Sequence, residues 1–558
     1  MHAPIKPLLL AVSMTIVSLS AQAAGPVAPG AGSILQQIQP PTPPLPPSAP
    51  ALTIERQDAG QLPETISFAV KHIEISGNTA FDSQTLHALV ADGEGKTLTL
   101  AQLEALAARI TDYYHRHGYP LARAIVPPQA IQSGTVRIEV IEAHYGQIKL
   151  DNSSRVVDGP LIATLAPLQS GQIITQAAMN RSLLLLSDIP GIVVDATLSP
   201  GTADGTSDLL VNTTPGPAAA GGIALDDYGN RYTGRVRLGG NLAFNNALHQ
   251  GDLLSLNALS SGNDLNYGRA AYQYLLNGQG THFGISYSAL RYILGGPLAS
   301  LKANGTAQIG SLWLSQPFVR TPNANLYGQI QYDHQQMRDH IDTSDTHTDR
   351  HTNGWTASLN GDTLDTFLSG GVNNYSANWT AGQLGFDNAV AQSVDAATAR
   401  TQGGFSKWNV NLTRLQRLSR QDGLYLSFSG QWANTNLDPV EQMIAGGPYS
   451  VRAYDMGAVA GDAGYLATAE LRHTLALSLY GQWQAVAFLD SEHVTINRNL
   501  WVAGINDATL SGAGVGLNWS GPNQWTAKAY IAAPIGSTPV LVGNTASVRA
   551  WLLIAKNL

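Results

Sequence analysis

Histidine and acidic residues that could bind a metal or act as acid and base are concentrated in one segment of the chain. His334, His340, His347 and His351 lie in a stretch rich in aspartate. Their spacings fit no fixed ligand geometry, so we interpret the stretch as a hydrated surface loop rather than a metal site. Asp333 directly precedes His334, but adjacent residues of a strand point to opposite faces, which argues against a catalytic pair. The sequence therefore predicts neither an enzyme nor a metal site.

Two glycine-containing motifs resemble nucleotide-binding loops but stand in the wrong context. Gly95-Lys96-Thr97 has the end of a phosphate-binding loop, yet the first glycine of that loop would fall at Val90. We interpret this triplet as the connection between two helices. The alternating glycines from Gly512 to Gly516 lie within a predicted strand, whereas a dinucleotide fingerprint requires a strand-to-helix turn. We therefore expect no nucleotide and no cofactor.

An arginine and an aspartate toward the C-terminus carry a more specific signal. Arg452 lies in a glycine-rich stretch, from Ile444 to Gly464, that is long for a connection between strands, and such loops are usually functional. Asp490 lies on a predicted strand, on the opposite face from Leu489. An ion pair between them, shielded from water, would hold the loop in place, and losing one partner would cost about 3–5 kcal/mol. The spacing equally allows a solvated Arg452 and an unrelated Asp490.

The composition indicates which kind of protein must position these residues. The chain has 558 residues, no cysteine, 56 glycines, a net charge of −8 and only 13% charged residues. The absence of cysteine excludes disulfides, thiolate zinc sites and a cysteine nucleophile, and the negative charge argues against nucleic-acid binding. No uninterrupted apolar stretch near the roughly 18 residues of a membrane helix occurs after the N-terminal segment. A glycine-rich, charge-poor chain of this kind favours a membrane β-barrel.

Strands with one apolar and one polar face follow one another from about residue 218 to the end. In one of them Leu424, Leu426 and Phe428 alternate with Tyr425 and Ser427. At about 10 residues per strand and a similar share for turns, this length predicts a 16-stranded antiparallel transmembrane barrel over residues 217–558. The last strand must pair with the first, because an open edge in lipid is costly. The longest expected connections are 337–352, 381–400 and 435–462.

The residues before the predicted barrel divide into four segments. Residues 1–23 have the positive residue, short apolar stretch and Ala21-Gln22-Ala23 cleavage site of a secretory signal peptide. Residues 24–65 form a proline-rich linker, in which residues 33–39 could make a short helix. Two β-α-α-β-β units follow, over 66–144 and 145–216. In the first unit we expect a strand from Phe68 to Ile75, a helix capped by Thr99 and Gln102, and a strand from Leu121 to Val126.

The order of these parts and a small set of residues resemble a known family. The residues that carry the likeness are Gly446, Gly447, Val451, Arg452 and Tyr454 in the long loop, and Phe488 and Asp490 on the following wall strand. In this combination the chain resembles the two-partner secretion transporters, the haemolysin secretion/activation family. It departs from the family pattern at Ala453 and Glu492, where glycine is usual, and at Leu558, where the family usually ends in an aromatic residue.

The resemblance implies a function and a location. The two small units would be POTRA domains in the periplasm of a Gram-negative bacterium, and the barrel would lie among outer-membrane lipids as a monomer. The POTRA domains would capture an unfolded exoprotein of the haemagglutinin, haemolysin or adhesin class, with the Leu121 to Val126 edge as one candidate binding strand. The loop over 435–462 would point into the bore, pinned through Arg452 and Asp490, and the short helix over 33–39 could plug the pore, as in some relatives.

Two other functions stay open on the sequence alone. A factor that assembles barrels in the outer membrane shares the architecture but usually carries more POTRA repeats. A general diffusion porin would need neither the two periplasmic units nor an arginine directed into the bore. Cargo-dependent secretion distinguishes the transporter from both alternatives.

Overall fold

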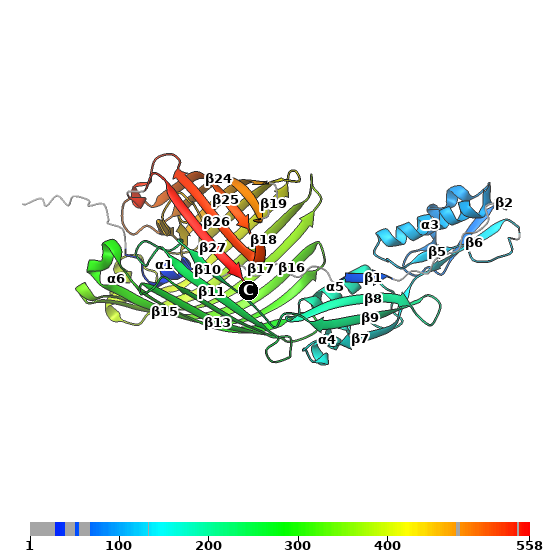
Figure 1. Ribbon diagram of the computed structural model, residues 1–558, viewed down its shortest axis with the longest axis horizontal. Helices are drawn as coiled ribbons and strands as arrows, with labels where there is room; N and C mark the ends of the chain where they lie inside the picture. Colours follow the sequence, from blue (N-terminus) through cyan, green and yellow to red (C-terminus); the bar gives the residue numbers. More distant parts are fainter. Residues whose placement is uncertain (1–27, 39–50, 55–66, 132, 476–479, 544–545) are drawn as a thin grey trace, which may run out of the picture.

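The computed structural model describes residues 28–38, 51–54, 67–131, 133–475, 480–543 and 546–558. The predicted signal peptide and most of the predicted linker lie outside these residues. Figure 1 shows two small domains beside a large barrel of tilted strands, with the second small domain next to the barrel. Among the described residues, no helix is long and apolar enough to cross a membrane.

The first small domain packs two helices against short strands. Its elements are β2 (Ser67–Val70), β3 (His72–Ser76), α2 (Ser83–Ala88), η1 (Ala91–Gly93), β4 (Lys96–Thr99), α3 (Leu100–Arg116), β5 (Arg123–Ile125) and β6 (Thr135–Ile141). β3, β6 and β5 form one sheet, and β2 pairs with β4. The predicted capping box at Thr99 and Gln102 begins α3, whose buried stripe includes Leu103 and Ile110.

Two local predictions for this domain are wrong. The expected single strand from Phe68 to Ile75 is two strands in different sheets, because the chain changes partner at Lys71, whose N–H donates to Gly134 C=O. The triplet Gly95-Lys96-Thr97 does not join two helices, since Lys96 and Thr97 belong to β4 and pair with β2. Both errors come from pairing with distant segments, which overrides local propensity.

A buried carboxylate holds the turn after β3 to the end of β6. Glu142 Oε1 accepts hydrogen bonds from the N–H groups of Thr79 and Ala80, each at 2.8 Å, and from the Tyr114 hydroxyl at 2.6 Å, while Oε2 accepts from the Thr79 hydroxyl. Burial alone would raise the pKa of Glu142, but these hydrogen bonds outweigh it and hold the pKa below its ordinary value. The ionised form is therefore favoured by the fold.

We expect Glu142→Ala to destabilise the first domain by at least about 3 kcal/mol, because it leaves several buried donors unpaired. Since folding lowers the pKa, the stabilisation by Glu142 is present above the unfolded-state pKa of about 4.3 and is lost as the pH falls through the folded value. Hydrogen exchange of residues 67–131 in the full-length protein measures both effects. Glu74→Ala, at an exposed carboxylate of the same domain, is the control, and equal exchange in both variants would contradict the assignment.

The second small domain repeats the layout. Its elements are β7 (His144–Asn152), α4 (Asp158–Leu165), α5 (Gln176–Ser187), β8 (Ile192–Pro200) and β9 (Thr206–Pro215). A fourth strand, β1 (Ala51–Ile54), comes from the linker and lies parallel to β8, so that the sheet order is β1-β8-β9-β7. Asp188, just after α5, holds the domain to the barrel through a 2.7 Å ion pair with Arg320.

Sixteen strands form a closed barrel, which confirms the predicted fold class. In order they are β10 (Ala219–Asp226), β11 (Arg237–Asn245), β12 (Leu253–Ser260), β13 (Leu265–Leu275), β14 (His282–Ile293), β15 (Ala303–Arg320), β16 (Ala324–Ile341), β17 (Thr346–Asp365), β18 (Gly371–Phe386), β19 (Gly403–Arg417), β20 (Asp422–Ala433), β23 (Ala463–Thr474), β24 (Gln482–Thr495), β25 (Asp507–Ser520), β26 (Trp525–Pro534) and β27 (Arg549–Asn557). β27 pairs antiparallel with β10, with Asn557 opposite Gly222, and this closes the ring.

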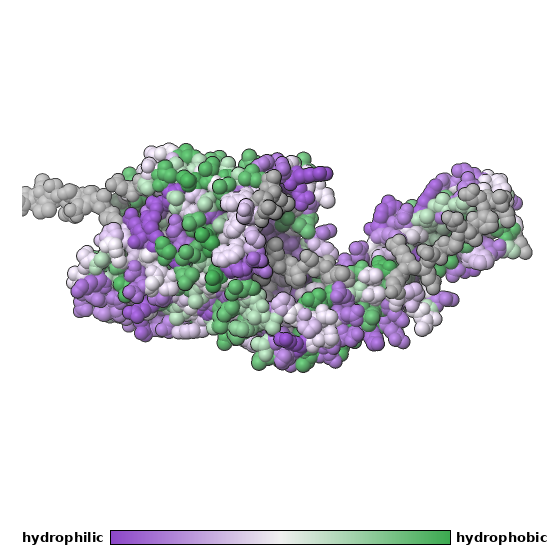
Figure 2. Space-filling view, viewed as in Figure 1, coloured by the Kyte–Doolittle hydropathy of each residue, from purple (hydrophilic) through white to green (hydrophobic). Residues whose placement is uncertain are grey.

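The outer wall of the barrel is apolar. Alternate residues such as Leu426, Leu489 and Val515 leave 41–60% of their surface exposed. Figure 2 shows hydrophobic residues gathered over this wall. Exposed apolar side chains on successive strands are what a lipid environment requires, while their sequence neighbours face the bore.

The expected long connection over 337–352 is wrong. β16 and β17 continue as paired strands, with Met337 opposite Arg350 and His340 opposite His347, and turn only at η3 (Asp342–Ser344). The apolar–polar alternation fades here because the outer face carries polar residues such as Arg338, while Met337 and Asp339 on the inner face lie against α1, but the backbone ladder continues. His334, His340, His347 and His351 therefore lie on strands rather than in a loop. β18 continues to Phe386 and β19 begins at Gly403, so the connection expected over 381–400 covers 387–402, and it contains the helix α6 (Ala389–Ala397).

Candidate functional site

The segment between β20 and β23, residues 434–462, folds back into the bore. Its arms pair as the short strands β21 (Met443–Ala445) and β22 (Val459–Gly461), with Ile444 opposite Ala460. The side chains of the segment contact inward-facing residues of β17, β19, β23, β24 and β27. Because these strands stand around much of the barrel wall, the segment must lie inside the barrel.

Two glycines set the shape of the tip. Gly446 and Gly447 have φ angles of 87° and 115°, a region that favours glycine. A Cβ on Gly446 would lie 2.5 Å from the Asp455 carbonyl oxygen, and a Cβ on Gly447 would lie 2.9 Å from the Met456 sulfur. The tip therefore requires glycine at both predicted positions.

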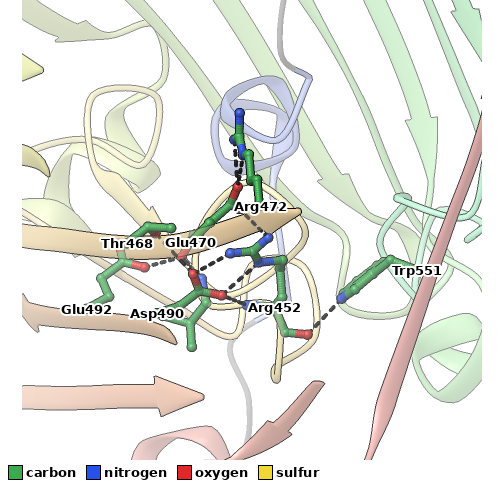
Figure 3. A network of polar contacts seen from close by, with 9 residues as sticks. Arg452, Thr468, Glu470, Arg472, Asp490, Glu492 and Trp551 are labelled. Atoms are coloured by element: carbon green, nitrogen blue, oxygen red, sulfur yellow. Dashed lines mark hydrogen bonds and ion pairs between the residues drawn. The ribbon is translucent and has the colours of Figure 1, made fainter. Parts of the chain in front are cut away.

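Arg452 joins the tip to the barrel wall through two carboxylates. Its Nε and Nη2 donate to the two oxygens of Asp490 on β24, at 2.8 and 2.7 Å, and its Nη1 donates to Glu470 on β23 at 2.7 Å (Figure 3). Arg472 donates to the other oxygen of Glu470 at 2.6 Å, and Thr468 donates to Asp490 at 3.0 Å. A second wall residue thus orients each carboxylate, so the acceptor oxygens for the Arg452 guanidinium are held in place.

Apolar and aromatic contacts surround this ion cluster. The guanidinium carbon of Arg452 lies 3.4 Å from the centre of the Phe488 ring, and the Trp551 indole N–H donates to the Arg452 carbonyl at 2.7 Å. Val451 and Tyr454 are fully buried in a cluster that includes Phe488. The structure thus brings Arg452 and Asp490 together, with Val451, Tyr454 and Phe488 around them.

The charges of the cluster are almost removed from solvent. Arg452, Asp490 and Glu470 are 3–6% exposed. Burying three charges is costly, so the cluster is favourable only while all of its members are present. Removing the arginine would leave two carboxylates in a poorly hydrated space, whereas the intact cluster holds the tip in one orientation.

Several residues of this network were not predicted from the sequence. Glu470 and Asp490 both pair with Arg452. In the sequence, Glu470 is only an acidic residue on the polar face of a predicted strand, and nothing there indicates a contact with Arg452. Glu492, which stands where the family usually has glycine, is fully buried and accepts a hydrogen bond from the Ser450 hydroxyl. Ala453, the other departure, packs against Gly512, which has no side chain to obstruct it. Glu492 thus adds a hydrogen bond between the wall and the inward segment, and the Ala453 methyl group fills the space beside Gly512.

Further ion pairs hold the same segment to other parts of the wall. Asp438 lies 2.6 Å from Arg350 on β17, and Glu441 lies 2.8 Å from Lys407 on β19. Near the tip, Asp455 pairs with Arg549 of β27 at 2.7 Å. The segment is thus fixed to opposite sides of the bore by charged contacts, in addition to the apolar cluster around Val451 and Tyr454.

A short helix from the linker lies in the bore beside this segment. α1 (Ala31–Gln36) begins and ends slightly before the predicted range of 33–39, and it contacts β14, β15, β16 and β21. Its Ala31 N–H donates to Asp339 at 2.7 Å, and its Gln36 side chain donates to the Val440 carbonyl. Helix and inward segment therefore occupy the bore together, as the ribbon in Figure 1 shows for α1.

At the candidate binding edge of the first small domain, two backbone groups are already bonded to side chains of α3. β5 lies at an edge of its three-stranded sheet, as expected for residues 121–126. However, the Ala124 N–H donates to Thr111 Oγ1 of α3 at 2.9 Å, and the Ala122 carbonyl lies 3.0 Å from His115 Nε2. An incoming strand would first have to displace these side chains.

Comparisons with known proteins agree with this architecture. Residues 205–519 match the family model of the haemolysin secretion/activation protein ShlB/FhaC/HecB, and residues 68–143 match the ShlB-type POTRA domain. The heme/hemopexin transporter protein HuxB of Haemophilus influenzae strain 86-028NP is 26% identical over 504 residues, 89% of this chain and 88% of the relative. The outer membrane transporter CdiB of Escherichia coli O6:K15:H31 is 25% identical over 513 residues, 87% of this chain and 85% of the relative.

Solved structures share the fold. CdiB from Escherichia coli superposes with a TM-score of 0.71 at 22% identity, covering 92% of this chain and 94% of that one. BamA from Haemophilus ducreyi lacking POTRA domains 1–3 superposes with a TM-score of 0.54 at 15% identity, covering 88% of this chain and all of that one. At these identities the likeness concerns the fold alone.

Proposed function

This chain belongs to the haemolysin secretion/activation family ShlB/FhaC/HecB, the two-partner secretion transporters of the outer membrane, and we propose that it captures an unfolded exoprotein with its POTRA domains and passes it outward through the barrel. We assign residues 66–144 to the first POTRA domain, 145–216 to the second and 217–558 to the barrel. Folding of the exoprotein outside the cell would give transport its direction.

The observation that carries this proposal is the way the bore is filled. The inward segment and α1 meet the wall through two apolar clusters, around Tyr454 and around Ile34, and through ion pairs that include Arg452 with Asp490 and Asp438 with Arg350. The charged groups can exchange their partners for water, or for the backbone of a passing chain, once the segment moves. We infer that rearrangement of the segment, released at Arg452, opens the path.

Strand addition supports the capture step. The linker strand β1 already lies along β8 of the second POTRA domain, with Thr53 opposite Thr197, so this edge accepts an extended segment (Figure 1). Main-chain hydrogen bonds of this type tolerate varied sequences, which suits an unfolded cargo. We propose that the exoprotein replaces β1 at the β8 edge, alone or together with the β5 edge.

A reversible lock tests this step. In Thr53→Cys/Thr197→Cys, oxidation would fix β1 on β8, and the chain has no other cysteine. We expect the oxidised protein to bind the exoprotein's N-terminal secretion domain at least about tenfold more weakly, equivalent to about 1.4 kcal/mol, and to recover after reduction. Binding is measured with the purified full-length protein in detergent, and secretion with both partners expressed together.

The control shares one cysteine with the test. Thr197→Cys/Leu210→Cys would link β8 to its inner neighbour β9, where these residues lie opposite each other, and would leave the outer edge of β8 unchanged. It should bind and secrete normally in both redox states. Normal binding by the oxidised Thr53→Cys/Thr197→Cys protein would remove the β8 edge from the capture step and leave β5 as the candidate.

A further inference from the structure

Three side chains outside the barrel converge on the surface of the first POTRA domain. They are His72 on β3, His87 on α2 and Glu94 in the turn before β4. One possible ligand atom from each side chain lies within 4.8 Å of the other two. Among the described residues, no other group of three or more histidine and acidic side chains has its ligand atoms this close together. Neither the inward segment nor the strand edges discussed above use these residues.

The carboxylate of Glu94 is the centre of the group. His72 Nδ1 lies 2.9 Å and His87 Nε2 lies 3.0 Å from the same oxygen, Oε1. The Ile73 N–H donates to that oxygen as well, at 2.7 Å. The backbone therefore fixes the carboxylate, and two imidazoles from different elements contact the same oxygen, with ring centres 5.8 Å apart.

These donors suit a transition metal of intermediate softness. Donor atoms of a tetrahedral Zn²⁺ site, with bonds of about 2.0–2.1 Å, lie about 3.3 Å apart, close to the two spacings around Glu94. Two imidazole nitrogens and one carboxylate oxygen form a common ligand set for Zn²⁺, whereas Mg²⁺ and Ca²⁺ prefer oxygen donors alone. The Ile73 N–H corresponds to the outer hydrogen bond that orients a ligating carboxylate.

The degree of exposure indicates the type of site. The side chains of Glu94 and His87 are 25% and 33% exposed, while that of His72 is 61% exposed. Protein ligands thus approach from one side, and the other side is open to water. Three protein ligands with an open position describe an accessible zinc site rather than a closed structural one.

We propose that His72, His87 and Glu94 bind one Zn²⁺ ion, with water at the open position. The ion would connect β3, α2 and the turn before β4. This site does not depend on the secretion proposal, because it can be tested without an exoprotein.

The test is titration of the full-length protein with Zn²⁺ in detergent, with the affinity tag removed. Calorimetry measures the affinity, and metal analysis after dialysis measures the number of ions bound per chain. We expect one Zn²⁺ per chain, with no comparable binding of Mg²⁺ or Ca²⁺. Loss of a residue that only hydrogen-bonds to a metal ligand weakens metal binding by about 10–100-fold. His72→Ala and Glu94→Gln each remove a ligand itself, so each should weaken Zn²⁺ binding by more than that. X-ray absorption at the zinc edge should report two imidazole nitrogens together with oxygen.

Two control variants exclude general histidine binding. His117→Ala removes an exposed histidine of the same domain, and His340→Ala breaks a histidine pair on the β16–β17 hairpin, where the ring centres of His340 and His347 lie 4.3 Å apart. Both should bind Zn²⁺ as the unsubstituted protein does. Unchanged stoichiometry and affinity in His72→Ala and Glu94→Gln would overturn the proposal, as would an unsubstituted protein that binds no Zn²⁺.

Discussion

Arg452→Ala is expected to abolish exoprotein secretion while leaving a folded barrel in the outer membrane. The substitution leaves Asp490 and Glu470 buried without their shared cation, a loss of about 3–5 kcal/mol. A change of that size shifts the population of the pinned tip by about 10²–10⁴-fold, so the tip should leave its position on β23 and β24. Secretion is measured as exoprotein in the medium, and barrel folding as the gel shift of the unheated protein.

Two further variants make the result specific. Arg452→Lys keeps the charge but lacks the fork that meets both carboxylates, so we expect it to remain strongly deficient. Arg414→Ala removes another wall arginine, which pairs with Asp365 at 2.6 Å and does not contact the inward segment, and it should secrete normally. Normal secretion by Arg452→Ala would end the role that we propose for the tip.

Deleting residues 66–143 is expected to prevent exoprotein binding in the periplasm. The deletion removes the first POTRA domain, including the β5 edge, whereas the second domain keeps its contact with the barrel through Asp188 and Arg320. The barrel closes through its own first and last strands, so its insertion should be unaffected. Binding is measured by cross-linking to the exoprotein's secretion domain, and we expect at least about a tenfold loss.

The amount of heat-modifiable barrel in the outer membrane is the control for the deletion. If the shortened protein still binds and exports the exoprotein, the first POTRA domain is not a receptor, and the β8 edge would have to act alone. If the deletion and the oxidised β1–β8 lock both impair binding, the two domains contribute jointly to capture.

The barrel was predictable because its signal is local. On each strand, alternation such as Leu426 against Ser427 follows from lipid on one side and water on the other, and no knowledge of neighbouring strands is needed. The prediction failed where that rule stops applying. Over 337–352 the outer face of the strands carries polar residues such as Arg338 and His340, and the inner face packs against α1 and the inward segment through Met337 and Arg350. The apolar–polar alternation therefore disappears, and the sequence alone predicts a loop where the strands are paired.

The candidate site was predictable only in part. The combination of Arg452, Asp490 and the tip glycines came from a resemblance, since spacing alone left a solvated arginine equally open. Glu470 was missed because its contact with Arg452 depends on the register of β23 and β24, which places Glu470 opposite Phe488. The signal that could have found it is an acidic residue at an inward-facing position of a neighbouring strand.

By itself, the amino-acid sequence determined the parts and their order: two small α/β units, a barrel of alternating strands and a long glycine-rich loop with one arginine. Only the tertiary structure decided which charges meet across the bore, that β1 covers β8, and that His72, His87 and Glu94 converge. The physical reason is the distance along the chain between the residues that interact. Alternation and capping act between residues close in the chain, whereas these contacts depend on strand order and on closure of the ring, which no local pattern specifies.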